Sequence, residues 1–237
     1  MAIKENNIVN LVNKTADFDS MMTKGFAIVT VMNVNVYNYT EANFVTKDET
    51  TGKITKTNTP NEVIAAYEKE GSKPLCEIKT LKVANVTMEG PTKTVTGGQY
   101  SNPLIKYGKT ARLEMQDALG SANVIEAFGG AFIGHAESTS GKITGLHFSE
   151  EFAGAKTLIG ESFFVDKETG RQIPVKVIFY QFLPDSLFNL TQDAEGDATV
   201  FDLNGDLLVS DVTLNDGSKD HKIGLFYSIV DPEEATA

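Results

Sequence analysis

The sequence has very few of the side chains that metal sites and nucleophilic sites use most often. Cys76 is the one cysteine among 237 residues, so the chain cannot form an internal disulfide, which suits a reducing compartment. His135, His147 and His221 lie far apart in the sequence and lack the spacing of a metal-binding pair on a helix. We therefore expect no metal, no cofactor and no catalytic residue, and we interpret Cys76 as a buried structural side chain.

Tryptophan is absent, and so are long apolar runs. Without tryptophan, an aromatic platform for binding carbohydrate would have to come from scattered tyrosines. No apolar stretch approaches the ~20 residues of a membrane-spanning helix. The first residues, MAIKENNIVNLVNK, lack the apolar core of a secretion signal. These absences argue against a membrane protein and against a secreted one.

Positive charge is scarce as well. The net charge of -11 argues against a protein that reads nucleic acid by neutralising phosphates, although it suits a surface past which a polyanion must slide. The carboxylates of Glu150-Glu151 and of Asp193 and Glu195 are interpreted as solvated acidic surface. The segment Asp202–Asp206 resembles half of a calcium loop but lacks the further ligands, so we interpret it as a plain turn.

Alternation of apolar and polar residues dominates the chain and predicts a mainly β fold. The clearest strand is Thr110–Gln116, in which apolar residues point to one face and Arg112, Glu114 and Gln116 to the other. About nine to eleven strands are expected, which indicates a β-sandwich or barrel with one or two short α-helices. The other predicted strands are Phe26–Tyr39, Leu75–Met88, Ile143–Phe148, Thr157–Val165, Arg171–Gln181, Thr199–Leu203, Asp206–Leu214 and Ile223–Val230.

Capping and turn signals predict where the helices begin and where hairpins turn. Thr59–Glu62 has the pattern of a capping box, with proline at the first helical position. A second helix, capped by Asp117 or Ser121, is expected to run through Phe128 and to end at Gly129-Gly130. Hairpin turns are predicted within Phe44–Thr57, at Asn204-Gly205 and at Asn215-Asp216-Gly217.

The first half of Glu89–Gly120 is a long polar run with neither a helix period nor a strand period. Its two adjacent glycines, in Thr96–Gln99, precede no helix, so a phosphate-binding loop is not expected. Two interpretations remain open. The run forms an intrachain hairpin packed on its own domain, or it is a surface that another subunit covers.

Two segments resemble the tail tube proteins of long-tailed bacteriophages, also called major tail proteins. The segment RQIPVKVIFYQFLPDSLFNLTQDAEGDATVFDLNGDLLV resembles the C-terminal part of that family. The segment GPTKTVTGGQYSNPLIKYGKTARLEMQDALG resembles its long inter-subunit loop, followed by a core strand and the flanking helix. The resemblance covers roughly Val83–Val230, in pattern and order. Residues 40–75 match no part of it and are interpreted as an insertion.

The resemblance implies a structural virion protein, a single β domain over residues 1–237 with no catalytic residues. Its copies would form hexameric rings that stack into the tail tube, through which double-stranded DNA passes without sequence-specific binding. The other partners implied are the tape measure, distal tail and terminator proteins. The location implied is the virion tail, after synthesis in the host bacterial cytoplasm. Contact segments would be an N-terminal arm (1–20), the long loop (89–109) and a C-terminal tail (228–237).

The strand after the long loop suggests which residue would face the bore, and the loop itself suggests which residues would meet a neighbouring subunit. Glu114 is the candidate for a side chain that faces the bore, because its strand alternates so regularly and an acidic lining lets DNA pass. The alternative is that Glu114 faces solvent or a neighbouring subunit. The apolar anchors expected in the loop are Val95, Tyr100, Leu104, Ile105 and Tyr107, with Gly97, Gly98 and Pro103 shaping its backbone.

Other functions remain as alternatives. The same fold would serve another tail component, such as a distal tail protein, a terminator or the tube of a sheathed tail, and copy number in the virion would separate these. A β-sandwich adhesin or a carbohydrate-binding module is a further alternative, which a glycan array would test. An enzyme is the weakest reading, because no convergent carboxylates can be located in the sequence.

Overall fold

The computed structural model describes residues 26–69, 71–79, 81–89, 92–94, 104–106, 110–117, 121–135, 143–148, 150–166, 172–185, 201–208, 212–220 and 227–230. Within these ranges the protein is mainly β, as predicted, with two short α-helices, α2 (Pro60–Glu68) and α3 (Ala122–Gly129), and a 3-10 turn, η3 (Glu41–Asn43). Neither of these two helices has the length and apolar character needed to cross a bilayer.

The strands agree in large part with the predicted ones. The described residues form 17 strands, more than the nine to eleven expected. Leu75–Met88 and Asp206–Leu214, each expected as one strand, are each divided into two. The strands that were not expected are Thr92–Thr94, Leu104–Lys106, Ala131–His135 and Lys219–Asp220. The strands are β1 (Phe26–Asn38), β2 (Val45–Lys47), β3 (Ile54–Thr57), β4 (Cys76–Ile78), β5 (Leu81–Glu89), β6 (Thr92–Thr94), β7 (Leu104–Lys106), β8 (Thr110–Asp117), β9 (Ala131–His135), β10 (Ile143–Phe148), β11 (Lys156–Asp166), β12 (Gln172–Pro184), β13 (Phe201–Asp202), β14 (Gly205–Leu207), β15 (Val212–Thr213), β16 (Lys219–Asp220) and β17 (Tyr227–Val230).

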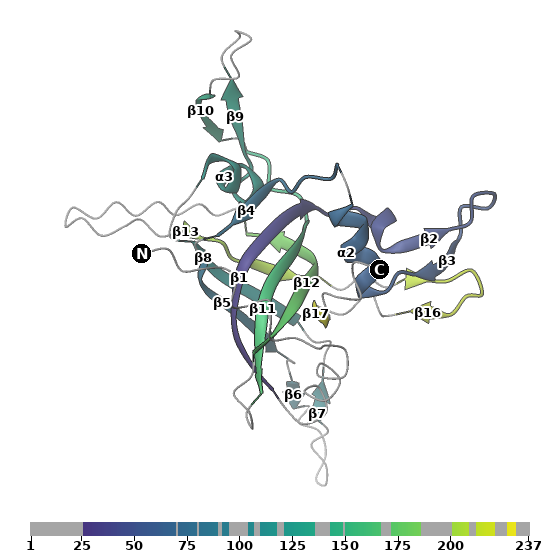
Figure 1. Cartoon of the computed structure of the whole chain (residues 1–237). Coiled ribbons are helices and arrows are strands. Elements are labelled where there is room, and N and C mark those ends of the chain that lie inside the picture. The colour runs from purple at the N-terminus through teal and green to yellow at the C-terminus, as the bar shows by residue number, and fades with distance from the viewer. Residues whose placement is uncertain are drawn as a thin grey trace.

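Nine of these strands form one antiparallel sheet that curls on itself (Figure 1). The hydrogen-bonded path runs β13-β8-β14-β12-β11-β1-β4, with β5 added beside β8 and β17 beside β12. The pairs β2–β3, β6–β7, β9–β10 and β15–β16 are separate two-stranded sheets that lie around the main sheet (Figure 1). The turns predicted within Phe44–Thr57 and at Asn215-Asp216-Gly217 are confirmed as the turns of β2–β3 and β15–β16.

The inner side of the curled sheet holds the main hydrophobic core. Val36 of β1, Leu113 of β8 and Phe182 of β12 are fully buried there. α3 packs against the same side, and its Phe128 ring lies 5.9 Å from that of Phe182. Each fully buried side chain of this kind contributes about 1.5–3 kcal/mol, so this core supplies much of the stability.

The opposite face of β11 and β12 is also apolar, and residues 40–75 cover it. Ile159, Ile178 and Tyr180 on that face pack against Phe44 and against α2. Phe44 is fully buried, with its ring centroid 5.9 Å from that of Tyr180. β12 is therefore buried on both faces in its central part. The segment that we interpret as an insertion supplies a second hydrophobic core.

α2 begins where the capping box predicts. The Thr59 hydroxyl accepts a hydrogen bond from the Glu62 N–H at 3.3 Å, and the Glu62 carboxylate accepts one from the Thr59 N–H at 2.7 Å. Pro60 occupies the first helical position, where no intrahelical N–H is needed. Lys56 of β3 forms an ion pair with Glu62 at 2.6 Å. These contacts satisfy the backbone donors at the start of α2 and connect the helix to the neighbouring hairpin.

α3 begins after Ser121, one of the two candidate caps. The Ser121 hydroxyl accepts a hydrogen bond from the Val124 N–H at 3.3 Å. Asp117, the other candidate, is instead the buried last residue of β8. Gly130 ends the helix in the left-handed conformation with φ of 64°, as the glycine pair predicts.

The predicted hairpin at Asn204-Gly205 is wrong. β13 and β14 pair with β8 in one unbroken register and therefore run in the same direction. Gly205 does not have the positive φ of a hairpin turn. A glycine is needed because β12 passes so close that a Cβ would meet the Leu183 carbonyl and the Phe182 ring. Close packing, and not a turn, explains this residue.

The predicted long loop and terminal segments are only partly described. β6 pairs with β7, so the stem of the 89–109 segment is an intrachain hairpin, and residues 95–103 lie outside the described part. The N-terminal arm 1–20 also lies outside it. Of the predicted C-terminal tail, residues 228–230 belong to β17 and pair with β12, which corrects the boundary of that tail.

Candidate functional site

One part of the outer sheet surface lies away from the second core and stays polar. It consists of outward side chains of β5, β8, β13 and β14, together with Asp185 just after β12. On β8 the predicted alternation is confirmed, because the apolar residues are buried and Arg112, Glu114 and Gln116 face outward. We call this surface the polar face. Its members are Asn85, Thr87, Glu89, Thr110, Arg112, Glu114, Gln116, Asp185, Asp202 and Asp206.

Backbone pairing places these side chains in rows across the strands. Glu114 lies opposite Asn85 of β5. Arg112 lies between Thr87 of β5 and Asp206 of β14. Side chains directly opposite on antiparallel strands are within reach of one another. The polar face is therefore one continuous surface over several strands.

Arg112 is the centre of this surface. Its guanidinium donates two hydrogen bonds to Asp185, one of them at 3.3 Å, and another to Asp206 at 3.3 Å. The Glu114 carboxylate lies 3.9 Å from the Arg112 Nε. The hydrogen bonds from Arg112 to Asp185 raise the pKa of Arg112 further above its ordinary value. Arg112 thus connects β8 with β14 and with the end of β12, while its side chain stays 40% exposed.

Carboxylates outnumber cations on the polar face. A hollow of about 240 Å³ opens there between Thr87, Arg112 and Asp206. Among its described residues, Arg112 is the one cation against five carboxylates. Such a surface repels a polyanion, because its carboxylates are in excess and its one described cation, Arg112, is already paired with Asp185 and Asp206. The carboxylates are Glu89, Glu114, Asp185, Asp202 and Asp206.

Two carboxylates of the polar face, those of Asp202 and Asp206, each bond to a neighbouring polar side chain. Asp202, in the segment that resembles half of a calcium loop, accepts a hydrogen bond from the Gln116 amide at 3.0 Å. Asp206 is bonded to Arg112. Among the residues that the structure describes, no three His, Cys, Asp or Glu side chains are grouped so that they could hold a metal ion.

Most residues predicted for a subunit interface lie outside the described part of the chain. Leu104 and Ile105 belong to β7, the second strand of the short hairpin. His147 is exposed on β10, whereas His221 and the side chain of His135 are not described. The interface residues outside the description are Val95, Gly97, Gly98, Tyr100, Pro103 and Tyr107.

Cys76 is buried on β4, as predicted. Burial raises the pKa of Cys76 to about 12. The positive charge of nearby Lys156 opposes this rise, and the negative charge of Asp117 adds to it. Lys156 is itself buried and donates a hydrogen bond to the Asn38 side-chain oxygen at 2.9 Å. Burial lowers the pKa of Lys156. Both groups fit a structural role inside the sheet.

We expect Cys76 to react with iodoacetamide at pH 8 at least ~100-fold more slowly in the native protein than in urea. The unfolded thiol loses its proton near pH ~8.5, whereas the folded thiol keeps its proton up to about pH 12. The stability linked to Cys76 is therefore complete below pH ~8.5 and is lost as the pH rises toward 12. Mass spectrometry measures the alkylation rate, and equal rates in both states would contradict the burial.

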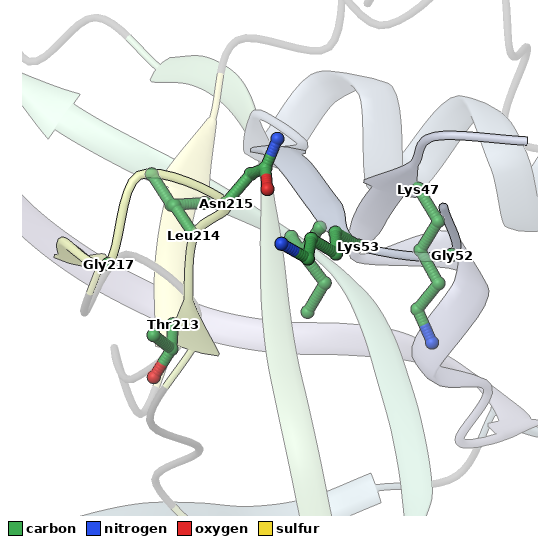
Figure 2. A pocket seen from close by; sticks show the side chains of 8 residues that line it. Lys47, Gly52, Lys53, Thr213, Leu214, Asn215 and Gly217 are labelled. Atoms are coloured by element: carbon green, nitrogen blue, oxygen red, sulfur yellow. The ribbon is translucent and has the colours of Figure 1, made fainter. Parts of the chain in front are cut away.

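Two hairpins that are distant in sequence join beside the sheet (Figure 1). The Asn215 N–H in the β15–β16 turn donates a hydrogen bond to the Ile54 carbonyl of β3 at 2.8 Å. We call β2–β3 and β15–β16 together the hairpin lobe. Between them lies an open pocket of about 420 Å³, the lobe pocket, which Figure 2 shows. Ile54 and Leu214 give it aliphatic surface, and Lys47 and Lys53 give it positive charge. Sequence reasoning missed this pocket, because its two sides come from segments far apart in the chain.

No protein-family model matches this sequence, and no curated protein is similar to it. The comparisons therefore indicate no family and no function for this chain.

Proposed function

We propose that this protein is the tail tube subunit of a long-tailed bacteriophage. Its copies associate as hexameric rings, the rings stack into a tube, and double-stranded DNA passes through the bore. The tape measure, distal tail and terminator proteins are its neighbours in the virion tail. The observation that carries this proposal is the division of the outer sheet surface into an apolar half, which residues 40–75 cover, and the acidic polar face.

The polar face has the properties that the bore of a DNA channel needs. Duplex DNA carries about one negative charge per 1.7 Å of its axis. A basic lining would hold it through counterion release, whereas an acidic one lets it pass. On the polar face Glu114 is exposed, and the neighbouring cation, Arg112, is already bonded to Asp185 and Asp206. We therefore assign the polar face, with Glu114, to the bore.

The hairpins around the main sheet supply contact surface for assembly. A ring closes through heterologous contacts, and stacking needs a second set of contacts on the same subunit. β6–β7 is the stem of the segment that resembles the inter-subunit loop of the family, and it lies apart from the main sheet (Figure 1). We assign this hairpin to the contact between subunits.

Negative-stain electron microscopy of the purified protein at high concentration tests the proposal, and rings or tubes are expected. The matched variant replaces residues 95–103 with an Asn-Gly turn, which suits a hairpin and keeps the pairing of Thr94 with Leu104. This variant should stay folded by circular dichroism and fail to polymerise, because it lacks the loop that reaches the next subunit.

Two results would contradict this picture. A wild-type protein that stays strictly monomeric, and that does not extend isolated phage tail tips, would exclude a tube subunit. Global unfolding of the shortened variant would show that residues 95–103 belong to the core of their own domain, so the loop would not be an inter-subunit element.

A further inference from the structure

The most exposed large hydrophobic side chains of the described residues lie close together in the chain. Phe152 is 81% exposed and Phe148 is 58% exposed. The backbone around them is held against the end of α3, where the Glu151 carbonyl approaches Gly130 so closely that a Cβ would collide with it. We call Phe148, Glu150, Glu151 and Phe152 the aromatic knob. The backbone at Glu151 therefore lies against the C-terminal end of α3.

The aromatic knob has the composition of a contact surface. Exposed aromatic side chains that gather in one place mark interaction sites, because each ring offers a large apolar area for burial. Glu150 and Glu151, which lie between the two phenylalanines in the sequence, add exposed negative charge. A matching surface must therefore offer an apolar hollow beside positive charge.

The lobe pocket offers that combination on the same chain. Its aliphatic surface comes from Ile54 and Leu214, both partly buried against the second core. Lys53 extends from the β2–β3 hairpin toward Leu214 (Figure 2). Lys47 forms an ion pair with Glu41 at 3.3 Å, whereas no described carboxylate pairs with Lys53. The pocket thus presents an available cation beside an apolar floor.

We propose that the aromatic knob of one copy inserts into the lobe pocket of the next copy around the ring. Phe152 packs on Ile54 and Leu214, and Glu150 approaches Lys53. This inference rests on the proposed function, since it supplies the ring-closing contact that a tube subunit needs. Opposite charges set the orientation of the contact, and the buried ring supplies its affinity.

The positions of the two surfaces make the contact heterologous. The β9–β10 hairpin leads into the aromatic knob and projects beside α3, whereas the hairpin lobe projects from another side, beside α2 (Figure 1). The knob of one copy therefore meets the pocket of a second copy. The first copy keeps an unoccupied pocket, and the second copy keeps an unoccupied knob. Repetition of such a contact builds a ring when the rotation between neighbouring copies closes. A stable interface buries roughly 1,600 Å², so the knob is an anchor within a wider contact.

Phe152→Ala is the first test. Truncation of a central aromatic anchor should raise the protein concentration needed for ring formation by more than ~10-fold, measured by sedimentation velocity over a concentration series. The monomer should keep its fold and thermal midpoint, because Phe152 is exposed. Lys69→Glu is the control for charge, since Lys69 is exposed at the end of α2 and lines neither the lobe pocket nor the aromatic knob.

Charge exchange is the second and more specific test. Lys53→Glu and Glu150→Lys should each weaken ring formation by ~10-fold or more, because each places like charges opposite one another. An equimolar mixture of the two variants should form rings again near the wild-type concentration. In the mixture every knob finds a pocket of opposite charge when the variants alternate, and a six-membered ring permits alternation.

These assembly measurements test the knob–pocket contact and the proposed tube function separately. Rings of wild-type protein, together with unchanged assembly of the Phe152→Ala, Lys53→Glu and Glu150→Lys variants, would overturn the contact and leave the tube subunit in place. Weakened variants that the mixture does not restore would overturn the pairing of Glu150 with Lys53. A wild-type protein without any rings would overturn the function and the contact together.

Discussion

The Gly205→Ala variant is expected to unfold at a much lower urea concentration, with a loss of about 3 kcal/mol in the free energy of unfolding. Gly205 lies opposite Pro184 of β12. A Cβ at this position would lie 2.6 Å from Cζ of Phe182 and would also meet the Leu183 carbonyl. That carbonyl belongs to the backbone of the sheet and Phe182 is fully buried, so neither group can move away without disturbing the core.

Urea denaturation followed by circular dichroism measures this loss, and two variants define its cause. Gly154→Ala is the control, because Gly154 has nothing within 4 Å of an added Cβ, and it should change stability by less than ~0.5 kcal/mol. Gly205→Asn separates close packing from turn chemistry. Asparagine is well tolerated in a two-residue hairpin turn, but it should be at least as harmful as alanine against β12. Losses below ~1 kcal/mol for both Gly205 variants would contradict the observed pairing.

The Phe44→Ala variant is expected to lose about 3–5 kcal/mol, the range for removing a fully buried phenylalanine. The Phe44 ring is completely inaccessible. Its centroid lies 5.1 Å from that of Tyr39, 6.1 Å from that of Tyr67 and 5.9 Å from that of Tyr180. Alanine would leave a cavity at the junction of β12 with residues 40–75, and the surrounding rings can close it only in part.

Phe152→Ala is the matched control for Phe44→Ala. Both changes remove a phenyl ring, but Phe152 is 81% exposed, so its loss should alter the free energy of unfolding of the monomer by less than ~0.5 kcal/mol. Urea titrations of the two variants, at concentrations below those that allow assembly, give the comparison. Equal and small losses would show that residues 40–75 are a dispensable insertion. A large loss for Phe44 alone would show that the insertion is part of the folding unit.

The two halves of the outer sheet surface explain why this distinction matters for function. The half around Ile178 and Tyr180 is apolar and needs cover even in the monomer, which residues 40–75 supply. The polar face around Arg112 is stable in water and needs no cover within the chain. One sheet therefore carries a second core on one half and exposes polar side chains on the other half.

The elements that were predicted correctly are those whose causes are local. The strand β8 follows from strict alternation, since successive side chains of a strand point to opposite faces. The start of α2 follows from Thr59 and Glu62, whose side chains reach backbone groups within one turn. Glu114 was assigned correctly to an outward polar face for the same reason. Its place in the bore stays a prediction.

Local sequence patterns fail where distant segments meet. On β12, Ile178 and Tyr180 are buried because Phe44 and α2 pack on them, which the expected strand Arg171–Gln181 did not indicate. Asn204-Gly205 has the pattern of a hairpin turn, but the nearness of β12 explains its glycine. Neither contact could be read from neighbours in the chain.

By itself, the sequence determined the mainly β class, the phase of its clearest strand, the start of α2 and the excess of negative charge. Each of these depends on composition or on residues within a few positions of one another. Only the tertiary structure decided which faces are covered, which carboxylates surround Arg112, and how Lys53 and Leu214 come to line one pocket. Those outcomes depend on strand order and on close packing between segments far apart in the chain, which local patterns do not encode.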